Sequence, residues 1–183
     1  QDLVPDDAYS QEIYSELVKV LIPYVDLYLC ETMSSVREAV NAASAARATD
    51  AEKPLWVAWT LDETPGMGLR SQETLADALA AVEEFKPDAY LFNCTSPTAI
   101  TAAVETLSAL TDKPIGAYPN SFHVPEGWTL DNEHAVQARD MTLEDFVSFS
   151  RAWRSKGASI LGGCCGIGPE LIDAMVKDQR SQT

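Results

Sequence analysis

The sequence predicts an α/β protein built from repeated strand–helix units. Short apolar runs alternate with longer segments of helical periodicity along nearly the whole chain. Three apolar runs open the same way, with a Lys-Pro pair that follows a helical segment: Lys53-Pro54, Lys86-Pro87 and Lys113-Pro114. A repeat of roughly 30 residues is the length that a right-handed β-α-β crossover requires. We therefore expect a parallel sheet with helices covering both of its faces.

The first expected element is a helix in the segment DDAYSQEIYSELVKVLIPYV, where either Asp6 or Asp7 is a suitable N-cap. Its apolar side chains recur at helical spacing, at Ile13, Leu17, Val20 and Leu21. A short apolar strand over 25–30 follows. The next helix is alanine-rich, covers 34–48, and is capped by one of the two serines at its start.

The next two units repeat this pattern. A strand over 54–60 is followed, after a loop that contains glycine, by a helix over 71–85, which opens with a sequence resembling a capping box. A strand over 88–93 precedes a helix over 97–110, where Pro97 suits the first helical turn.

The last part of the chain contains a strand over 114–118, a helix over 142–156, a strand over 158–163 and a closing helix over 169–178. A long polar loop, 119–141, separates the first of these strands from the helix that follows it. His123 and His134 in this loop lack ligand spacing and are expected to be solvated. Trp128, in the same loop, would either flank a substrate pocket or anchor the loop.

The number of units distinguishes an open sheet from a barrel. No glycine-rich phosphate-binding fingerprint follows any expected strand, which disfavours a nucleotide-type doubly wound sheet. Five strand–helix units follow the leading helix, whereas a closed (β/α)8 barrel needs eight and typically about 250 residues. We expect a TIM-barrel fragment with strands 4 to 8, in which residues 1–183 form the C-terminal portion of one domain. A start at Gln1 instead of Met agrees with further sequence upstream.

Composition excludes several classes of partner. The chain has 183 residues, a formal net charge of −15 and 46% hydrophobic residues, which is typical of soluble globular proteins. The acidic balance argues against nucleic acid, whose phosphates it would repel. No apolar run approaches the roughly 20 residues of a membrane span, and no secretory signal opens the chain, so no membrane association is expected. We expect a cytoplasmic protein with reduced, buried or metal-bound cysteines.

Two adjacent cysteines, Cys164 and Cys165, lie between glycine pairs in the stretch ILGGCCGIGPE. A disulfide between neighbours would close a strained ring, whereas two thiolates can share one metal ion with a third ligand. Cys94 directly follows the strand 88–93, as the pair follows the last strand, and the carboxyl ends of parallel strands share one rim. Three thiolates suit Zn²⁺ and leave a fourth position for a substrate. A substrate thiol bound there would be deprotonated, which favours alkyl transfer to a thiol.

Polar residues follow two other expected strands and reach the same rim. Glu31 and Thr32 come after the strand 25–30, and Asn120 comes after the strand 114–118. A carboxylate in this position favours a binding role, although Thr32 and Asn120 are equally typical of turns and caps. Cys30, at the end of its strand, is expected to be a small core residue.

The stretches GGCCGIGPELI, FNCTSP, LCETMSSVREA and YPNS resemble the homocysteine S-methyltransferase family, from its fourth barrel strand to its end. The resemblance implies a zinc-dependent (β/α)8 barrel that moves a methyl group from a sulfonium or betaine-type donor to homocysteine, giving methionine. It implies that Cys94, Cys164 and Cys165 bind Zn²⁺ and that Glu31 binds the amino group of homocysteine, with Thr32 and Asn120 nearby. The family's opening strand has no counterpart in these residues.

Several alternatives remain open. The substrate thiol could belong to an analogue such as selenocysteine, and neither the individual donor nor the oligomeric state follows from the sequence. A thiol redox or metal-handling protein would use the vicinal pair and would oxidise Cys164 and Cys165 reversibly, with no role for Glu31. A non-catalytic barrel fragment is the third possibility.

Overall fold

The computed structural model describes residues 4–123 and 137–182. Helices and strands alternate along the chain, and every expected element is present, although β1 lies three residues later and α3 begins four residues later than expected. The elements are α1 (Asp7–Leu21), β1 (Tyr28–Met33), α2 (Val36–Thr49), β2 (Leu55–Trp59), α3 (Leu75–Val82), a 3₁₀ turn η1 (Glu83–Phe85), β3 (Ala89–Asn93), α4 (Pro97–Ser108), β4 (Ile115–Tyr118), β5 (Phe122–His123), β6 (Gln137–Ala138), α5 (Leu143–Ser155), β7 (Ala158–Leu161) and α6 (Pro169–Ser181).

The central sheet has five parallel strands in the order β1-β2-β3-β4-β7. Each crossover passes through at least one helix, as the sequence predicts for an α/β protein. The strands are in register at their carboxyl ends, where Asn93 of β3 lies opposite Tyr118 of β4. The expected loop 119–141 contains one further feature, a short antiparallel pair formed by β5 and β6.

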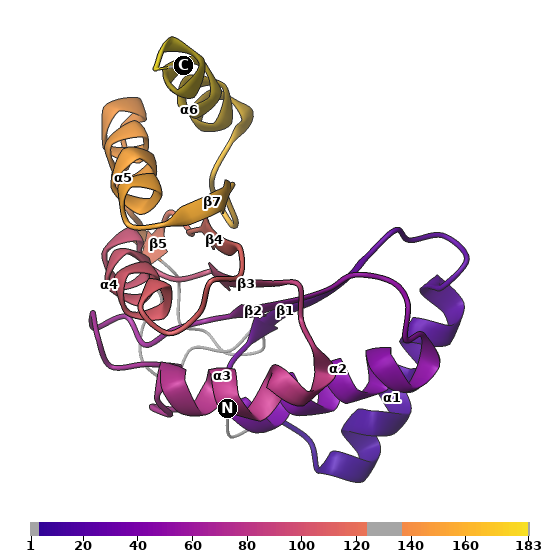
Figure 1. Cartoon of the computed structure of the whole chain (residues 1–183). Helices are drawn as coiled ribbons and strands as arrows, with labels where there is room; N and C mark the ends of the chain where they lie inside the picture. The colour runs from indigo at the N-terminus through magenta and orange to yellow at the C-terminus, as the bar shows by residue number, and fades with distance from the viewer. Residues whose placement is uncertain (1–3, 124–136, 183) are drawn as a thin grey trace.

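The helices pack on one face of the sheet, so the expectation that they cover both faces is wrong (Figure 1). Alternate strand residues such as Val57, Trp59 and Phe92 form the main core with the buried alanines of α2 and the apolar side of α4. The other face carries a smaller cluster of Ala58, Ala89 and Leu91, packed only against the partly buried side chains of Trp56, Tyr118 and Ile160. A curved sheet with helices on its outer side leaves that inner face open.

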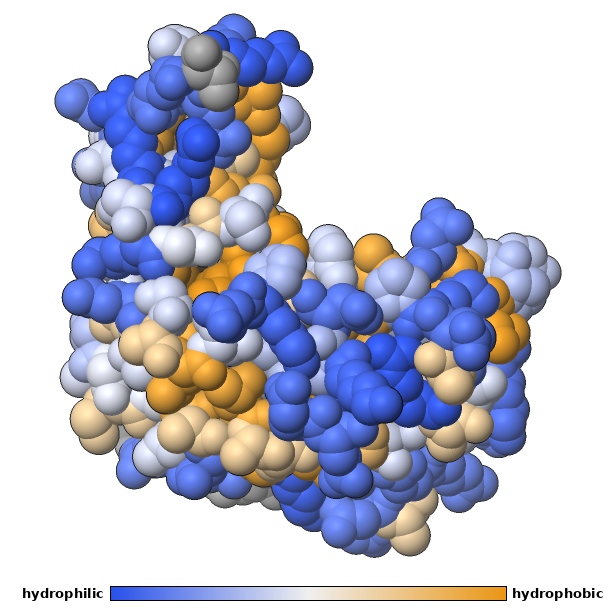
Figure 2. Space-filling view, in the orientation of Figure 1, coloured by the Kyte–Doolittle hydropathy of each residue, from blue (hydrophilic) through white to orange (hydrophobic). Residues whose placement is uncertain are grey.

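Figure 2 shows the resulting hollow between the arm that carries α5 and α6 and the rest of the molecule, with hydrophobic residues on the wall of this arm. Both edges of the sheet, β1 and β7, pair on one side only within the described part of the chain.

Helix α1 has the expected N-cap, Asp6, whose side chain accepts from the Tyr9 backbone N–H. Three of the apolar residues expected to face the sheet, however, point to solvent: Ile13, Leu17 and Val20 are 43%, 51% and 66% exposed. Val18 joins the main core instead, and α1 also contacts α2 through polar groups such as Asp7, which accepts from Asn41. The helical period of α1 is therefore correct, but it describes an exposed apolar stripe.

Helix α3 begins four residues later than the sequence predicts. Gln72 has φ 66°, in the left-handed region, so the backbone cannot continue a helix through it. The N-cap is Thr74, whose hydroxyl accepts from the Asp77 backbone N–H. The serine expected to start the helix, Ser71, donates instead to the Glu73 carboxylate.

Two loop predictions have different outcomes. His123 is exposed on β5, as expected for a solvated residue. His134 and Trp128 lie outside the described residues. No helix in the described part of the chain is long and apolar enough to cross a membrane.

Candidate active site

The structure brings three thiols together at the carboxyl ends of β3 and β7. The Cys94 Sγ lies 3.9 Å from that of Cys165, and the Cys164 Sγ lies 3.8 Å from that of Cys165. All three sulfurs lie within 4.8 Å of one another. In a tetrahedral site with Zn–S bonds of about 2.3 Å, two sulfur ligands are about 3.8 Å apart. The cluster therefore has the spacing that one tetrahedral metal ion requires.

The backbone around Cys94 is held in an unusual conformation. Cys94 has φ 52°, in the left-handed region, which is uncommon for a residue with a side chain. Its carbonyl oxygen accepts from Nη2 of Arg70 at 3.0 Å and from the Thr60 hydroxyl at 3.3 Å. Its N–H donates to the Tyr118 carbonyl. These contacts fix the direction in which the Cys94 side chain leaves the strand.

The double-cysteine turn is tied to the segment after β4. The Cys164 N–H donates to the Pro119 carbonyl at 2.8 Å, and the Ser121 N–H donates to the Cys165 carbonyl at 2.9 Å. Gly166 follows with φ 77°, and a Cβ at this position would lie 2.0 Å from the Ser121 Oγ. A glycine is therefore required for the turn to approach residues 119–121 so closely.

The three thiols do not share protons equally. A hydrogen bond from Cys94 lowers the pKa of Cys164 to about 6, helped by the Cys165 backbone and the Asn93 side chain. The pKa of Cys94 is raised because it donates that bond and is partly buried. Burial and the neighbouring Cys164 raise the pKa of Cys165. The cluster thus favours a thiolate at Cys164, and a bound cation would favour loss of the protons on the other two thiols.

Glu31 and Thr32 lie within strand β1, which continues to Met33, and not after the strand as the sequence predicts. Cys30 is opposite Val57, but the next pair is Met33 with Trp59, so β1 holds one residue more than β2. This is a β-bulge, with φ 63° at Thr32. Cys30 and Met33 are both buried, whereas the two residues between them are both exposed. The bulge therefore turns Glu31 and Thr32 together away from the main core.

Sequence reasoning gave no role to Tyr118, which ends β4. Its hydroxyl oxygen is buried and has no hydrogen-bond partner among the described residues. Burial and the negative charge of Glu31 raise the pKa of Tyr118, with smaller contributions from Cys164 and Cys94. The Tyr118 phenol is therefore protonated, and it interacts electrostatically with Glu31 as well as with the thiols. This tyrosine is the first residue of YPNS, one of the stretches that resemble the family, but the stretch alone does not indicate a role for it.

Two other predicted residues are buried. Asn120 is behind the cysteine turn, where its N–H donates to the Thr95 carbonyl and its Oδ1 has no partner in the described chain. A substrate contact by its side chain stays a prediction. Cys30 belongs to the main core, as expected, and burial raises its pKa to about 12.

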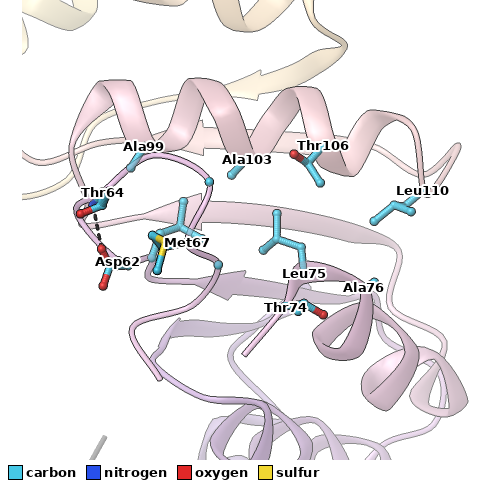
Figure 3. Close-up of a pocket in the computed structure, with 13 residues that line it drawn as sticks. Asp62, Thr64, Met67, Thr74, Leu75, Ala76, Ala99, Ala103, Thr106 and Leu110 are labelled. Atoms are coloured by element: carbon cyan, nitrogen blue, oxygen red, sulfur yellow. Dashed lines mark hydrogen bonds between the residues drawn. The ribbon is translucent and has the colours of Figure 1, made fainter. Parts of the chain in front are cut away.

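A pocket of about 290 Å³ lies elsewhere, on the helical side of the sheet (Figure 3). Met67 and Leu75 face Ala99, Ala103 and Leu110 of α4 and its C-terminal end across it. Neither the thiols nor Glu31 line this pocket, so it is not part of the candidate site.

The fold and the site define an α/β protein with three cysteines, spaced as one tetrahedral metal ion would require, at the carboxyl ends of parallel strands. The family model described as Homocysteine S-methyltransferase matches residues 4–178, and the chain belongs to this family, as its motifs indicate.

Several named proteins are similar to the chain. Homocysteine S-methyltransferase 3 of Arabidopsis thaliana is 32% identical over 83% of this chain and 43% of the relative. Selenocysteine methyltransferase of Astragalus bisulcatus is 33% identical over 84% and 44%. Homocysteine S-methyltransferase YbgG of Bacillus subtilis (strain 168) is 30% identical over 93% and 52%. The chain spans about half the length of the curated relatives it matches.

Among solved structures, the apo form of the homocysteine methyltransferase MmuM from Escherichia coli superposes with a TM-score of 0.76 at 23% identity. The match covers 97% of this chain and 59% of that one. The metallated form of the same protein superposes with a TM-score of 0.74 at 22% identity. These likenesses show the fold.

Proposed function

We propose that this chain belongs to an enzyme that transfers a methyl group from a sulfonium or betaine-type donor to the thiol of homocysteine, giving methionine. The observation that carries the proposal is the group of three thiols within 4.8 Å of one another, in a member of the homocysteine S-methyltransferase family. Homocysteine and the donor are small molecules, and the acidic chain is not expected to bind nucleic acid or a membrane. Four free thiols suit the reducing cytoplasm.

The donor set favours Zn²⁺ as the metal, with Cys94, Cys164 and Cys165 as ligands. Thiolates are soft ligands, and three of them leave one tetrahedral position for a substrate sulfur. When bound, Zn²⁺ would keep that sulfur deprotonated at neutral pH. A metallated form of the E. coli relative is consistent with a metal in this chain.

The residues of the chain would orient the substrate for transfer. Glu31 is exposed beside the cluster and would bind the ammonium group of homocysteine, next to Thr32. The sulfur lone pair would then form the new carbon–sulfur bond while the bond from the methyl carbon to the donor atom breaks. The donor atom keeps that electron pair and loses its positive charge. Asn120 would support the substrate side of the cysteine turn.

We also propose that the five parallel strands are strands 4 to 8 of a (β/α)8 barrel, so that residues 1–183 form the C-terminal portion of a homocysteine-binding domain. The one-sided helical layer, the apolar inner face and the two edges β1 and β7 support this arrangement. In a closed barrel the inner face would be filled by side chains of the remaining strands.

Metal analysis of the full-length protein tests the proposal. We expect one Zn²⁺ per wild-type chain, and loss of Zn²⁺ and of methionine formation in Cys94→Ser and Cys165→Ser. Without the metal, the substrate thiol would return to a pKa of about 8.5 and be mostly protonated at neutral pH. Cys30→Ser is the matched control and should keep its Zn²⁺. Full zinc retention in both site variants would exclude this centre.

A thiol redox protein is the second candidate, favoured by the short Sγ distances and by the exposure of Cys165. It requires reversible oxidation of the vicinal pair in the working cycle. If catalytic turnover of the vicinal pair by reversible oxidation continues without Zn²⁺ and is unaffected by Glu31→Gln, the redox function is favoured over methyl transfer.

A further inference from the structure

Asn93 connects the thiol cluster to the strand that carries Glu31. It is the last residue of β3, is fully buried, and directly precedes Cys94. Its side-chain amide makes two hydrogen bonds to Thr32. Oδ1 accepts from the Thr32 N–H at 3.2 Å, and Nδ2 donates to the Thr32 hydroxyl at 2.7 Å.

This contact crosses a strand. β1 and β3 lie on opposite sides of β2 and have no ladder hydrogen bonds with each other. At the level of Thr32, the bulge in β1 interrupts the regular pairing with β2, which would otherwise use the Thr32 N–H. The Asn93 amide takes the place of the missing partner. The Thr32 N–H is part-buried, and without the Asn93 amide it would lose its hydrogen-bond partner, so the bulge depends on this side chain.

The same residue contributes to both halves of the candidate site. Through Thr32 it holds the left-handed backbone that presents Glu31 and Thr32 side by side. On the other side its backbone leads directly into Cys94, which has φ 52° in the left-handed region. Between Glu31 and the sulfur of Cys94 the connection therefore runs through the Thr32 backbone and one buried amide, not through a mobile loop.

We propose that Asn93 is a positioning residue that sets the separation between the Glu31 carboxylate and the thiol cluster, and so selects the substrate thiol by its length. The inference rests on the proposed function, in which an amino-acid thiol spans these two points. Homocysteine has one methylene more than cysteine between its amino group and its sulfur. A difference of one methylene discriminates substrates by about 10–200-fold when the binding points are fixed.

The test compares the dissociation constants of homocysteine and cysteine in the full-length, zinc-loaded protein. We expect Asn93→Ala to keep its Zn²⁺ but to lose at least tenfold in its preference for homocysteine, because Glu31 is no longer held at one distance. If Asn93 had a merely structural role, the variant would bind homocysteine and cysteine more weakly by the same factor.

Asn41→Ala is the matched control. Asn41 is also a buried asparagine that joins two elements, since its Nδ2 donates to Asp7 at 2.9 Å and its Oδ1 accepts from Gln11 at 3.1 Å. It lies between α1 and α2, in the helical layer. This variant should lose stability without a change in the homocysteine-to-cysteine ratio.

Thr32→Val removes the hydroxyl that accepts from Asn93. This variant tests the positioning role if Asn93→Ala does not fold or loses its metal. It should lower the ratio in the same direction. An unchanged ratio in the folded, zinc-loaded Asn93 variant, or in Thr32→Val when that variant is the one measured, would overturn the positioning role. That result would leave the proposed function intact. The proposed function itself fails if the zinc-loaded wild type binds neither thiol.

Discussion

The four cysteines show how position in the fold decides the chemistry of a single residue type. Cys30 points into the main core, where burial raises its pKa to about 12 and keeps it a thiol. Cys164, at the end of a strand and beside another thiol, has its pKa lowered to about 6. Both residues end apolar runs in the sequence. What separates them is the presence of sulfur and amide neighbours from distant parts of the chain.

At Glu31, removal of the charge tests the binding role directly. We expect Glu31→Gln to keep its Zn²⁺ but to raise the KM for homocysteine by about tenfold or more, because a charge-assisted hydrogen bond worth about 1.5–3 kcal/mol becomes a weaker neutral one. Steady-state kinetics with elemental analysis of the same sample measure both effects. If KM and kcat stay at wild-type values, Glu31 does not contact the substrate.

Asp50 provides a pH-dependent test away from the thiols, in the loop between α2 and the amino end of β2. It accepts from the Glu52 N–H at 2.9 Å and from Lys53 Nζ at 3.0 Å, and these bonds lower its pKa to about 2. Because the folded pKa lies below the unfolded value of about 3.9, the stabilising contribution is complete above pH 4. It is lost as the pH falls from about 4 toward 2.

The variant Asp50→Asn should therefore be less stable than the wild type at pH 5, and the difference should shrink as the pH approaches 2. Urea unfolding of both proteins across this range, followed by circular dichroism, measures the difference. A gap in stability that does not change with pH would show that the Asp50 charge contributes nothing.

The sequence alone predicts those residues of the candidate site that directly follow a strand. The cysteines were found because a parallel sheet places all carboxyl ends at one rim, whatever their distance in sequence. Asn93 was present in the same motif as Cys94 but was not assigned a role, because its partner Thr32 is 61 residues away. The bulge that orients Glu31 depends on that distant contact. No local pattern in LCETMSS predicts a bulge.

At the scale of the elements, local capping chemistry fixes the helix starts. The sequence SQETLAD offers two candidate N-caps, and the left-handed backbone at Gln72 decides in favour of Thr74. At α5 the capping pattern is unambiguous, and the observed start agrees with the expected one. Propensity therefore predicts that a helix exists, whereas its first residue depends on the conformation of the preceding loop.

Helix α5 carries a complete capping box. The Thr142 hydroxyl accepts from the Asp145 N–H, and the Asp145 carboxylate accepts from the Thr142 N–H at 3.1 Å. Thr142→Ala should lower the free energy of unfolding by about 1 kcal/mol, because it leaves a first-turn N–H without its partner. Chemical denaturation measures this loss.

Thr106→Ala is the control for that change. Thr106 is exposed within α4, and its hydroxyl only donates back to the Ala102 carbonyl. Alanine has the higher helix propensity at such a position, so stability should stay the same or rise slightly. Equal destabilisation in the two variants would contradict a specific capping contribution.

At the scale of the whole molecule, the exposed apolar side chains lie on several elements. Large exposed apolar side chains include Ile13, Leu17 and Val20 of α1 and Leu29 of the edge strand β1. Others lie at Met67, at Leu110 after α4 and at Leu143, the first residue of α5, whereas the main core is buried. The sequence predicts the α/β units because each is locally encoded, but the faces left open depend on which strands and helices lie beside them.

The last prediction concerns residues 1–183 expressed by themselves. β1 and β7 each have an unpaired edge in the described part of the chain, and unpaired apolar edges favour association. We expect this polypeptide to oligomerise or aggregate, and to show little methyl transfer to homocysteine. It should bind Zn²⁺ weakly, because the three cysteines are present but nothing closes the rim around them. Light scattering and metal titration measure the two properties.

Addition of the remaining barrel strands, fused upstream or supplied as a separate chain, should give a compact unit with tight metal binding and activity. The edges would then be paired, and the inner face with Trp56 and Ile160 would be covered. A polypeptide of residues 1–183 that stays monomeric and turns over homocysteine without any addition would show that the sheet needs no closure. The barrel proposal would then be wrong, while the three-thiol centre would still explain the activity.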